Sequence, residues 1–244
     1  MQHLSTATIN YQNRSFPFYF REGNVDGDLN GMHQIFERND YGFDEWHQGQ
    51  RFNAYFAKST ELQKGLIIDA GANIGAAAVY FLETYKKSFL YCIEPEINNW
   101  NLLSKNTEKY TSKKLFHGGV SNQDGILYLE DPDRSTMGFV THQANRPGEN
   151  LIAVPAISPQ TILTEMNAHV PMIFKIDIEG AEDYLFSGST EWLDCFPLVI
   201  IELHDWMLPF SGSSRNFLRA VANHDFDFIY KNENVFLFNR KILG

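Results

Sequence analysis

From residue 65 onward, short apolar runs alternate with segments of helical periodicity, and this alternation constrains the fold more than any other feature. The apolar runs lie at 65–69, 89–94, 114–118, 172–177 and 198–203. They lack the polar–apolar alternation of half-exposed strands and are typical of strands buried on both faces. The helical segments lie between them, at 73–86, 97–110, 159–168, 180–187 and 213–224. We therefore predict an α/β three-layer sandwich, in which helices cover both faces of a mostly parallel sheet.

The end of the chain departs from this pattern. Two strand-like segments, Asp225–Lys231 and Asn234–Arg240, flank the turn residues Asn232 and Glu233. A tight turn joins antiparallel strands, so these segments predict a C-terminal hairpin beside the parallel strands. The expected sheet has seven strands and is mostly parallel.

The residues before the first buried run are predicted to form a separate unit. We expect an N-terminal extension over residues 1–61 and a main domain over residues 62–244, with an insertion at 126–157 that contains a strand pair. The extension reads as a hairpin of Thr6–Tyr11 with Phe16–Arg21, followed by helices at Leu29–Arg38 and Glu45–Leu62.

Three aromatic residues of the extension, Tyr41, Phe43 and Trp46, have two interpretations. They can form a lid over a site in the main domain, or they can clasp the extension to that domain by hydrophobic packing. The clasp is favoured, because packing is the commoner role of clustered aromatic side chains.

The charge of the chain limits the classes of partner. Asp and Glu number 30 against 20 Lys and Arg, for a formal net charge of −10. A grip on nucleic acid requires clustered basic residues, so we predict no nucleic-acid partner. The same balance predicts no role at a membrane surface.

The first twenty residues contain no apolar segment after a basic start, which argues against a secretory signal. Cys92 and Cys195 have neither metal-ligand nor CxxC spacing. Both lie in apolar surroundings, which predicts small buried side chains. A cytoplasmic location fits this cysteine usage best.

The first buried strand runs directly into a turn of small residues with the pattern D-x-G-x-N-x-G. Its members are Asp69, Gly71, Asn73 and Gly75. Glycines let the backbone approach a ligand closely, and the helix that follows presents free N–H groups. The pattern is not the G-x-G-x-x-G of pyrophosphate sites, and Asp69 would repel a diphosphate. A cofactor with ammonium and sulfonium groups tolerates the carboxylate, so the loop favours S-adenosylmethionine over a nicotinamide dinucleotide.

Glu94 ends the second buried strand, about twenty residues after Gly75. A carboxylate there is placed to accept hydrogen bonds from two ribose hydroxyls. Both this residue and the glycine loop are expected at the carboxyl edge of the sheet, where open α/β sheets bind ligands.

Acidic residues and a histidine follow the fourth and fifth strands of the main domain. Asp177 and Glu179 come after the fourth strand, and Glu202 and His204 come at the end of the fifth. The two strands are expected to be neighbours, so these side chains should meet over one edge. Glu182, in the next helical turn, has a structural interpretation as an acid that complements the helix dipole.

The segments IIDAGANIGAAAVYF, CIEPE, KIDIEGAE and IIELHD together resemble the FkbM family of S-adenosylmethionine-dependent methyltransferases, over roughly residues 30–240. The resemblance implies a class I methyltransferase fold, which is Rossmann-like, and five strand–helix units closed by a hairpin agree with that order. It implies that the chain methylates a hydroxyl group of a sugar or of a natural product such as a macrolide polyketide. The cofactor would be S-adenosylmethionine and the product S-adenosylhomocysteine.

The resemblance also assigns roles to individual residues. Asp69, Gly71, Asn73, Gly75 and Glu94 would hold the cofactor. Gly119, Val120 and Ser121 match the stretch that lies along the adenine, and Asp177 matches the acid beneath the methionine end.

His204 is the preferred general base for the acceptor hydroxyl, because an ordinary imidazole has a pKa near 6.5. Asp177 or Glu202 would orient it or hold the acceptor. The same residues, with Glu179, can hold Mg²⁺ or Mn²⁺, but the spacing shows no dedicated metal motif and a metal is not favoured.

Two other functions stay open at this point. A nicotinamide-dependent oxidoreductase shares the early strand–helix pattern, and a non-catalytic methyltransferase-like module would bind the cofactor without turnover. The expected partner is a small-molecule or glycan acceptor, and the sequence leaves a homodimer open.

Overall fold

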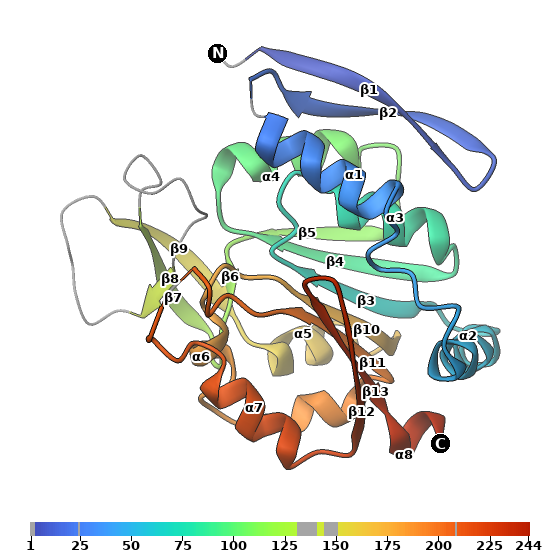
Figure 1. Ribbon diagram of the computed structural model, residues 1–244, viewed down its shortest axis with the longest axis vertical. Helices are drawn as coiled ribbons and strands as arrows, with labels where there is room; N and C mark the ends of the chain where they lie inside the picture. Colours follow the sequence, from blue (N-terminus) through green and yellow to red (C-terminus); the bar gives the residue numbers. More distant parts are fainter. Residues whose placement is uncertain (1–2, 24, 131–140, 144–150, 208) are drawn as a thin grey trace.

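A seven-stranded sheet forms the centre of the computed structural model, which describes residues 3–23, 25–130, 141–143, 151–207 and 209–244 (Figure 1). The strand order is β12-β13-β11-β10-β3-β4-β5. Five strands are parallel: β3 (Gly65–Ala70), β4 (Ser88–Glu94), β5 (Lys113–His117), β10 (Val170–Ile176) and β11 (Leu198–Glu202). The hairpin of β12 (Phe226–Lys231) and β13 (Asn234–Asn239) joins β11 antiparallel. The predicted sheet and its hairpin are confirmed.

The central strands are buried on both faces, as their apolar composition predicts. Every residue of β3 is buried, and neighbouring side chains point into two different cores. Ile67 packs in the core on one face, whereas Leu66 and Ile68 pack in the core on the other.

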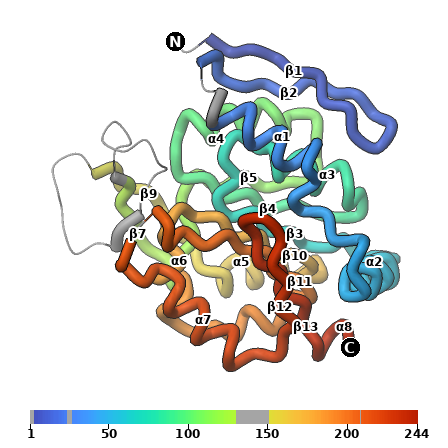
Figure 2. Tube along the Cα trace, in the orientation of Figure 1, coloured from blue at the N-terminus to red at the C-terminus, as the bar shows by residue number. Residues whose placement is uncertain are grey.

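Helices cover each face of the sheet. The first core includes residues of α1 (Asn30–Phe36), α2 (His47–Ser59), α3 (Ala76–Thr84), α4 (Ile97–Asn106) and α8 (Arg240–Leu243). The second includes residues of α5 (Pro159–Glu165), α6 (Glu182–Leu185), the 3₁₀ helix η3 (Glu191–Cys195) and α7 (Arg215–Ala222). The molecule is therefore the three-layer α/β sandwich that the sequence predicts (Figure 2).

A smaller sheet stands beside the main one, in the order β6-β9-β7-β8. β7 (Gly125–Glu130) and β9 (Leu151–Ile157) pair antiparallel, where the sequence predicts a strand pair. β8 (Thr141–Gln143) and β6 (Gly119–Val120) complete the sheet. The rest of the predicted insertion, 131–140 and 144–150, lies outside the described residues.

The N-terminal residues form a hairpin of β1 (Leu4–Tyr11) and β2 (Arg14–Arg21), then one π-helical turn, η1 (Val25–Leu29), before α1. In Figure 1 the hairpin lies over the layer that contains α3 and α4. Asn106 of α4 fastens it: its amide oxygen accepts from the Tyr19 N–H at 2.7 Å, and its amide nitrogen donates to the Tyr19 carbonyl at 2.9 Å.

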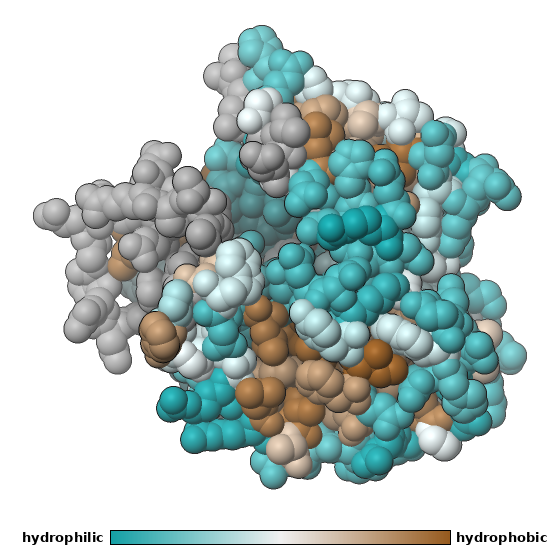
Figure 3. All heavy atoms as spheres, in the orientation of Figure 1, coloured by the Kyte–Doolittle hydropathy of each residue, from teal (hydrophilic) through white to brown (hydrophobic). Residues whose placement is uncertain are grey.

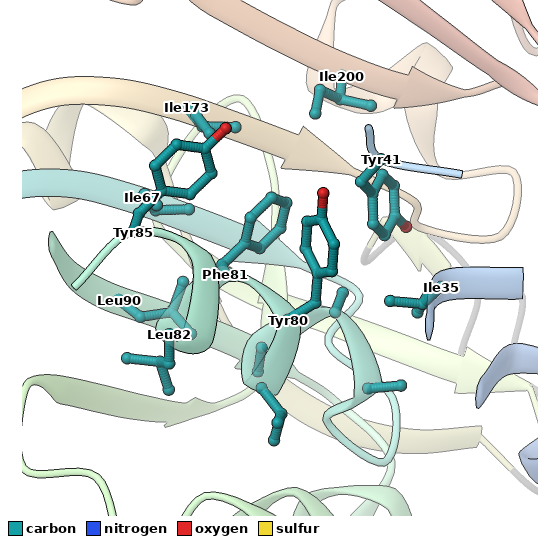
Figure 4. Packing of buried hydrophobic residues seen from close by; sticks show 14 of the residues in the cluster. Ile35, Tyr41, Ile67, Tyr80, Phe81, Leu82, Tyr85, Leu90, Ile173 and Ile200 are labelled. Carbon is teal, nitrogen blue, oxygen red and sulfur yellow. The ribbon is translucent and has the colours of Figure 1, made fainter. Parts of the chain in front are cut away.

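The three aromatic residues of the extension pack against the main domain. Tyr41 stacks on Phe81 with ring centroids 5.5 Å apart and lies beside Tyr80 (Figure 4). Phe43 and Trp46 pack edge to face against Phe236 of β13, at 6.1 and 5.2 Å. Phe43 and Trp46 therefore clasp the extension to the sheet.

The two cysteines differ in exposure. Cys92 is buried in β4, as predicted, but Cys195 is exposed, so the prediction for Cys195 is wrong. Cys195 ends the 3₁₀ helix η3, whose buried side chains are Trp192 and Leu193. The apolar neighbours in the sequence therefore face inward while Cys195 faces solvent.

No helix among the described residues has the length and apolar composition needed to cross a bilayer.

Candidate active site

The carboxyl ends of β3, β10 and β11 bring three loops together. The loop after β3 begins at Gly71, the loop after β10 at Asp177, and the loop after β11 contains His204. The Asp177 N–H donates to the Ala70 carbonyl at 3.1 Å, which joins the first two loops directly. The neighbouring parallel strands thus place the predicted residues at one edge of the sheet.

The glycine loop requires its glycines at two positions. Gly71 has φ +75°, and a Cβ there would lie 1.7 Å from the Asp177 carbonyl oxygen. Gly75, with φ +94°, precedes the first residue of α3. Asn73 between them also has a left-handed φ of 48°, which asparagine tolerates better than most residues. The loop can therefore approach β10 only with glycine at its first turn.

Glu94 stabilises the glycine loop through hydrogen bonds to backbone N–H groups. Its Oε2 accepts the Asn73 N–H at 2.7 Å, and its Oε1 accepts the Glu96 N–H at 2.9 Å. Burial raises the pKa of Glu94 to about 7, although these two backbone N–H groups oppose the shift. Both of its oxygens have protein partners, so Glu94 holds the loop in shape.

Lys175 is a buried cation that the sequence reasoning missed. It lies in β10 in register with Asp69 of β3, and its Nζ lies 3.1 Å from Asp69 Oδ1 and 3.3 Å from Asp177 Oδ2. It also donates to the Gly71 carbonyl at 2.7 Å. Burial lowers the pKa of Lys175, but the two carboxylates outweigh this and raise it above its usual value. Asp69, which is fully buried, is therefore neutralised by Lys175. A lysine inside an otherwise apolar strand was the available signal, since a buried charge needs a partner.

His204 is almost entirely buried, with 2% of the side chain exposed. Its Nδ1 lies 2.7 Å from Glu182 Oε1, while its Nε2 lies 3.5 Å from Asp177 Oδ1 and 3.6 Å from Glu202 Oε1. A carboxylate only accepts, so Nδ1 carries the proton of the first bond. Nε2 is then the nitrogen that faces Asp177 and Glu202.

The carboxylates shift the ionisation of this group. Burial lowers the pKa of His204, but the hydrogen bond to Glu182 and the charge of Asp177 raise it to about 9. Burial and the charge of Asp177 raise the pKa of Glu202 to about 8. The ordinary imidazole pKa assumed from the sequence therefore does not apply in this environment.

Glu182, interpreted from the sequence as a helix-dipole residue, is the partner that orients His204. The helix predicted at 180–187 is only one turn, α6, and it begins late because Glu179 and Gly180 have φ values of 53° and 91°. These left-handed residues turn the chain so that Glu179 faces the cluster. Ligand atoms of Asp177, Glu179 and His204 lie within 4.8 Å of one another, so three of the four predicted metal donors come together.

A cavity of about 400 Å³ opens over this edge. Gly71, Asn73, Asp177, Glu202 and His204 line it. The other predicted cofactor residues are not among the described residues that line it: Asp69, Gly75, Glu94, Gly119, Val120 and Ser121. The last three lie at or next to β6 and are buried.

The opposite wall of the cavity comes from elements at the two ends of the chain. From the N-terminal side, residues between Gly27 and Tyr41 line it, and from the β12–β13 turn Glu233 and Asn234 do so. These parts are bonded together: Asn232 Nδ2 donates to Asp40 Oδ1 at 2.8 Å, and Lys231 Nζ donates to the Gly42 carbonyl at 2.5 Å. In Figure 3 hydrophilic side chains surround a hollow between the N-terminal elements and the rest of this face. The sequence reasoning did not find this wall.

The sheet order, the glycine loop and the acidic carboxyl edge define the class I methyltransferase fold. Residues 69–231 match the model of the methyltransferase FkbM domain. The chain belongs to the FkbM methyltransferase family.

One curated relative is the hexuronic acid methyltransferase AglP of Haloferax volcanii, 25% identical over 137 residues. The match spans 56% of this chain and 54% of the relative, so it covers only about half of either protein.

Two similar solved structures are a methyltransferase from Geobacter sulfurreducens and an rRNA methylase from Streptococcus thermophilus. The first has a TM-score of 0.37 at 13% identity and covers 86% of this chain and 87% of that one. The second has a TM-score of 0.45 at 9% identity and covers 81% and 99%.

Proposed function

We propose that the chain transfers a methyl group from S-adenosylmethionine to a hydroxyl of a sugar or sugar-containing natural product. Family membership supports methyl transfer over the oxidoreductase alternative. The single observation that carries the site assignment is the convergence of the glycine loop, Asp177 and the Glu182–His204 pair on one cavity.

The donor groups of the cavity fit this cofactor. S-adenosylmethionine supplies an activated methyl group on a positively charged sulfur. Asp177, Glu179 and Glu202 face the cavity. Burial raises the pKa of Glu179 and Glu202, and a bound cation would favour their charged forms, whereas the pyrophosphate of a dinucleotide would meet Asp177 and no free basic group. We assign the methionine end to Asp177 and the loop of Gly71 and Asn73.

The remaining predicted cofactor residues keep supporting roles in this proposal. Asp69 acts through Lys175, and Glu94 acts through the Asn73 N–H. Gly75 shapes the loop before α3. Gly119, Val120 and Ser121 remain the proposed adenine side of the site, on the family resemblance alone.

His204 is the proposed general base. Glu182 holds Nδ1, which leaves Nε2 to accept the proton of the acceptor hydroxyl as the new bond forms. Glu202 and Asp177 are placed to stabilise the resulting imidazolium, since both lie within 3.6 Å of Nε2. The reaction then needs no metal, although the Asp177, Glu179 and His204 donors stand together.

The test is titration with S-adenosylhomocysteine and with NADH, followed by incubation with S-adenosylmethionine and glycoside acceptors. We expect the protein to bind S-adenosylhomocysteine and not NADH. We also expect an acceptor to gain the mass of one methyl group on an oxygen. Binding of S-adenosylhomocysteine without methylation of any acceptor would favour the non-catalytic module. Loss of activity after chelation of divalent metals would contradict the metal-free mechanism.

A further inference from the structure

The described wall of the cavity carries more negative than positive side chains. Its carboxylates are Asp28, Asp40, Asp177, Glu179, Glu202 and Glu233. Its basic side chains, among the residues that the structure describes, are Lys175 and His204.

Neither basic side chain has a donor left for an anionic substrate. Lys175 is 3% exposed and is held by Asp69, Asp177 and the Gly71 carbonyl. His204 is 2% exposed and lies between Glu182 on one side and the Asp177 and Glu202 carboxylates on the other. A carboxylate entering the cavity would therefore meet mainly other carboxylates.

Part of the acidic wall is balanced by arginines behind it, and part is not. Asp28 pairs with Arg21 at 2.6 Å and Asp40 with Arg38 at 2.9 Å. On the other side, Glu179, Glu202 and Glu233 line the cavity, and none of them forms an ion pair with a lysine or arginine among the described residues. The excess of negative charge is thus concentrated on the side formed by Glu179, Glu202 and Glu233.

Trp206 adds an apolar surface next to these acids. It lines the cavity with 63% of the residue exposed, and its ring centroid lies 6.4 Å from that of His204. An exposed indole offers a flat face against which the C–H face of a sugar ring can pack. Carboxylates nearby accept hydrogen bonds from sugar hydroxyls, so the two features together suit a polyhydroxylated ring.

We propose that this cavity selects an uncharged sugar and rejects the corresponding hexuronate. This inference rests on the proposed sugar O-methyl transfer. Trp206 packs against the ring, Glu179 and Glu202 accept its hydroxyl hydrogens, and Glu233 at the rim repels an anion. The acceptor thus differs in charge from the hexuronic acid named for the archaeal relative.

The test compares two matched acceptor pairs: methyl glucoside with methyl glucuronide, and methyl galactoside with methyl galacturonide. We expect kcat/KM for the uncharged member to exceed that for the uronate by about tenfold or more, as like charges in a partly buried site require. Equal or faster methylation of the uronates would overturn charge selection while leaving the proposed function intact. Methyl transfer to none of the four, with S-adenosylhomocysteine still bound, would overturn this inference together with the sugar acceptor.

A rim variant separates charge from other causes. Glu233→Lys is expected to raise the ratio of kcat/KM for the uronates to kcat/KM for the uncharged glycosides by about three- to tenfold. Glu61→Lys makes the same change in net charge at an exposed residue that does not line the cavity, and it should leave this ratio unchanged. An equal response of the two variants would contradict selection at the rim.

The stacking surface has its own control. Trp206→Ala should raise KM for the glycosides by about tenfold with S-adenosylhomocysteine affinity unchanged, and Trp206→Phe should restore much of the loss. Phe210→Ala removes a fully exposed aromatic side chain of the same loop that does not line the cavity. If Trp206→Ala behaves like Phe210→Ala, the indole is no part of the acceptor site.

Discussion

The carboxyl edge of the sheet and the opposite wall of the cavity are built in different ways. At the edge, Lys175, Glu182 and His204 are buried and held by short polar contacts. At the wall, some contacts are made by exposed side chains, such as Gln34 with Glu233 at 3.3 Å, and others are half-buried, such as Asn232 with Asp40. The family match covers 69–231, which includes the edge but neither Gly27–Tyr41 nor Glu233. We infer that the edge carries the common chemistry and that the wall contributes to the choice of acceptor.

The largest effect on the chemistry is expected at His204. His204→Gln should lower turnover by about 10²- to 10⁴-fold while S-adenosylhomocysteine affinity changes little, because a base is lost but the loop is not. In the parent enzyme the base must be deprotonated, so kcat/KM should rise with pH through the His204 pKa of about 9. The measurement is the pH–rate profile of both proteins. Near-normal turnover in the variant would remove His204 as the base.

The buried ion pair should control stability more than any contact of the wall. Lys175→Met leaves Asp69 buried without its ion-pair partner, which should lower the free energy of unfolding by about 3–5 kcal/mol in urea titrations. Combining it with Asp69→Asn should restore much of the loss. Lys114→Met, which breaks an exposed pair with Glu165, is the control and should cost about 0–1 kcal/mol. Equal losses of unfolding free energy in Lys175→Met and Lys114→Met would show that the edge is no more sensitive to substitution than an exposed ion pair.

The next largest effect is expected at Gly71, where the glycine loop approaches the end of β10 closely. Gly71→Ala should destabilise the protein by roughly 3 kcal/mol and abolish S-adenosylhomocysteine binding, because its Cβ would collide with the Asp177 carbonyl. Gly23→Ala is matched in backbone, with φ +85°, but its Cβ would meet no atom within 4 Å. It should cost only about 1 kcal/mol. Unfolding curves and calorimetry of the two variants distinguish a packing requirement from backbone strain alone.

A substitution in the wall should have the smallest effect of these variants. Its effect on binding should be limited to the acceptor. Asn232→Gly removes the hydrogen bond to Asp40 and keeps the left-handed backbone, so stability should fall by about 1 kcal/mol. We expect KM for the acceptor to rise a few-fold and S-adenosylhomocysteine affinity to stay the same. Asn13→Gly, in the left-handed turn between β1 and β2, is the control. A loss of cofactor affinity in Asn232→Gly would break the division between edge and wall.

The sequence predicts the sheet well because its central strands are continuous apolar runs, which are typical of strands buried on both faces. It also predicts that Asp177 and His204 meet, since neighbouring parallel strands end at the same edge. It does not predict the partner of Asp69, because the cross-strand register with Lys175 is a tertiary property. The sequence places Glu182 correctly in the first turn of a helix, but it does not predict that this carboxylate contacts His204, which is also a tertiary property.

The wall could not be predicted from local patterns. Its hydrogen bonds join Asp40 to Asn232 and Gly42 to Lys231, residues that lie at opposite ends of the chain. Polar side chains in turns carry no signal for such distant partners.

Titration of the protein with S-adenosylhomocysteine tests the central claim most directly. The account predicts one bound molecule per chain, and at least about tenfold weaker binding to Asp177→Asn, which removes a carboxylate from the cavity. Asp205→Asn, at an exposed acid of the loop after β11 that does not line the cavity, should bind like the parent protein. Absence of binding to the parent protein, or equal binding to both variants, would contradict the placement of the cofactor at this edge.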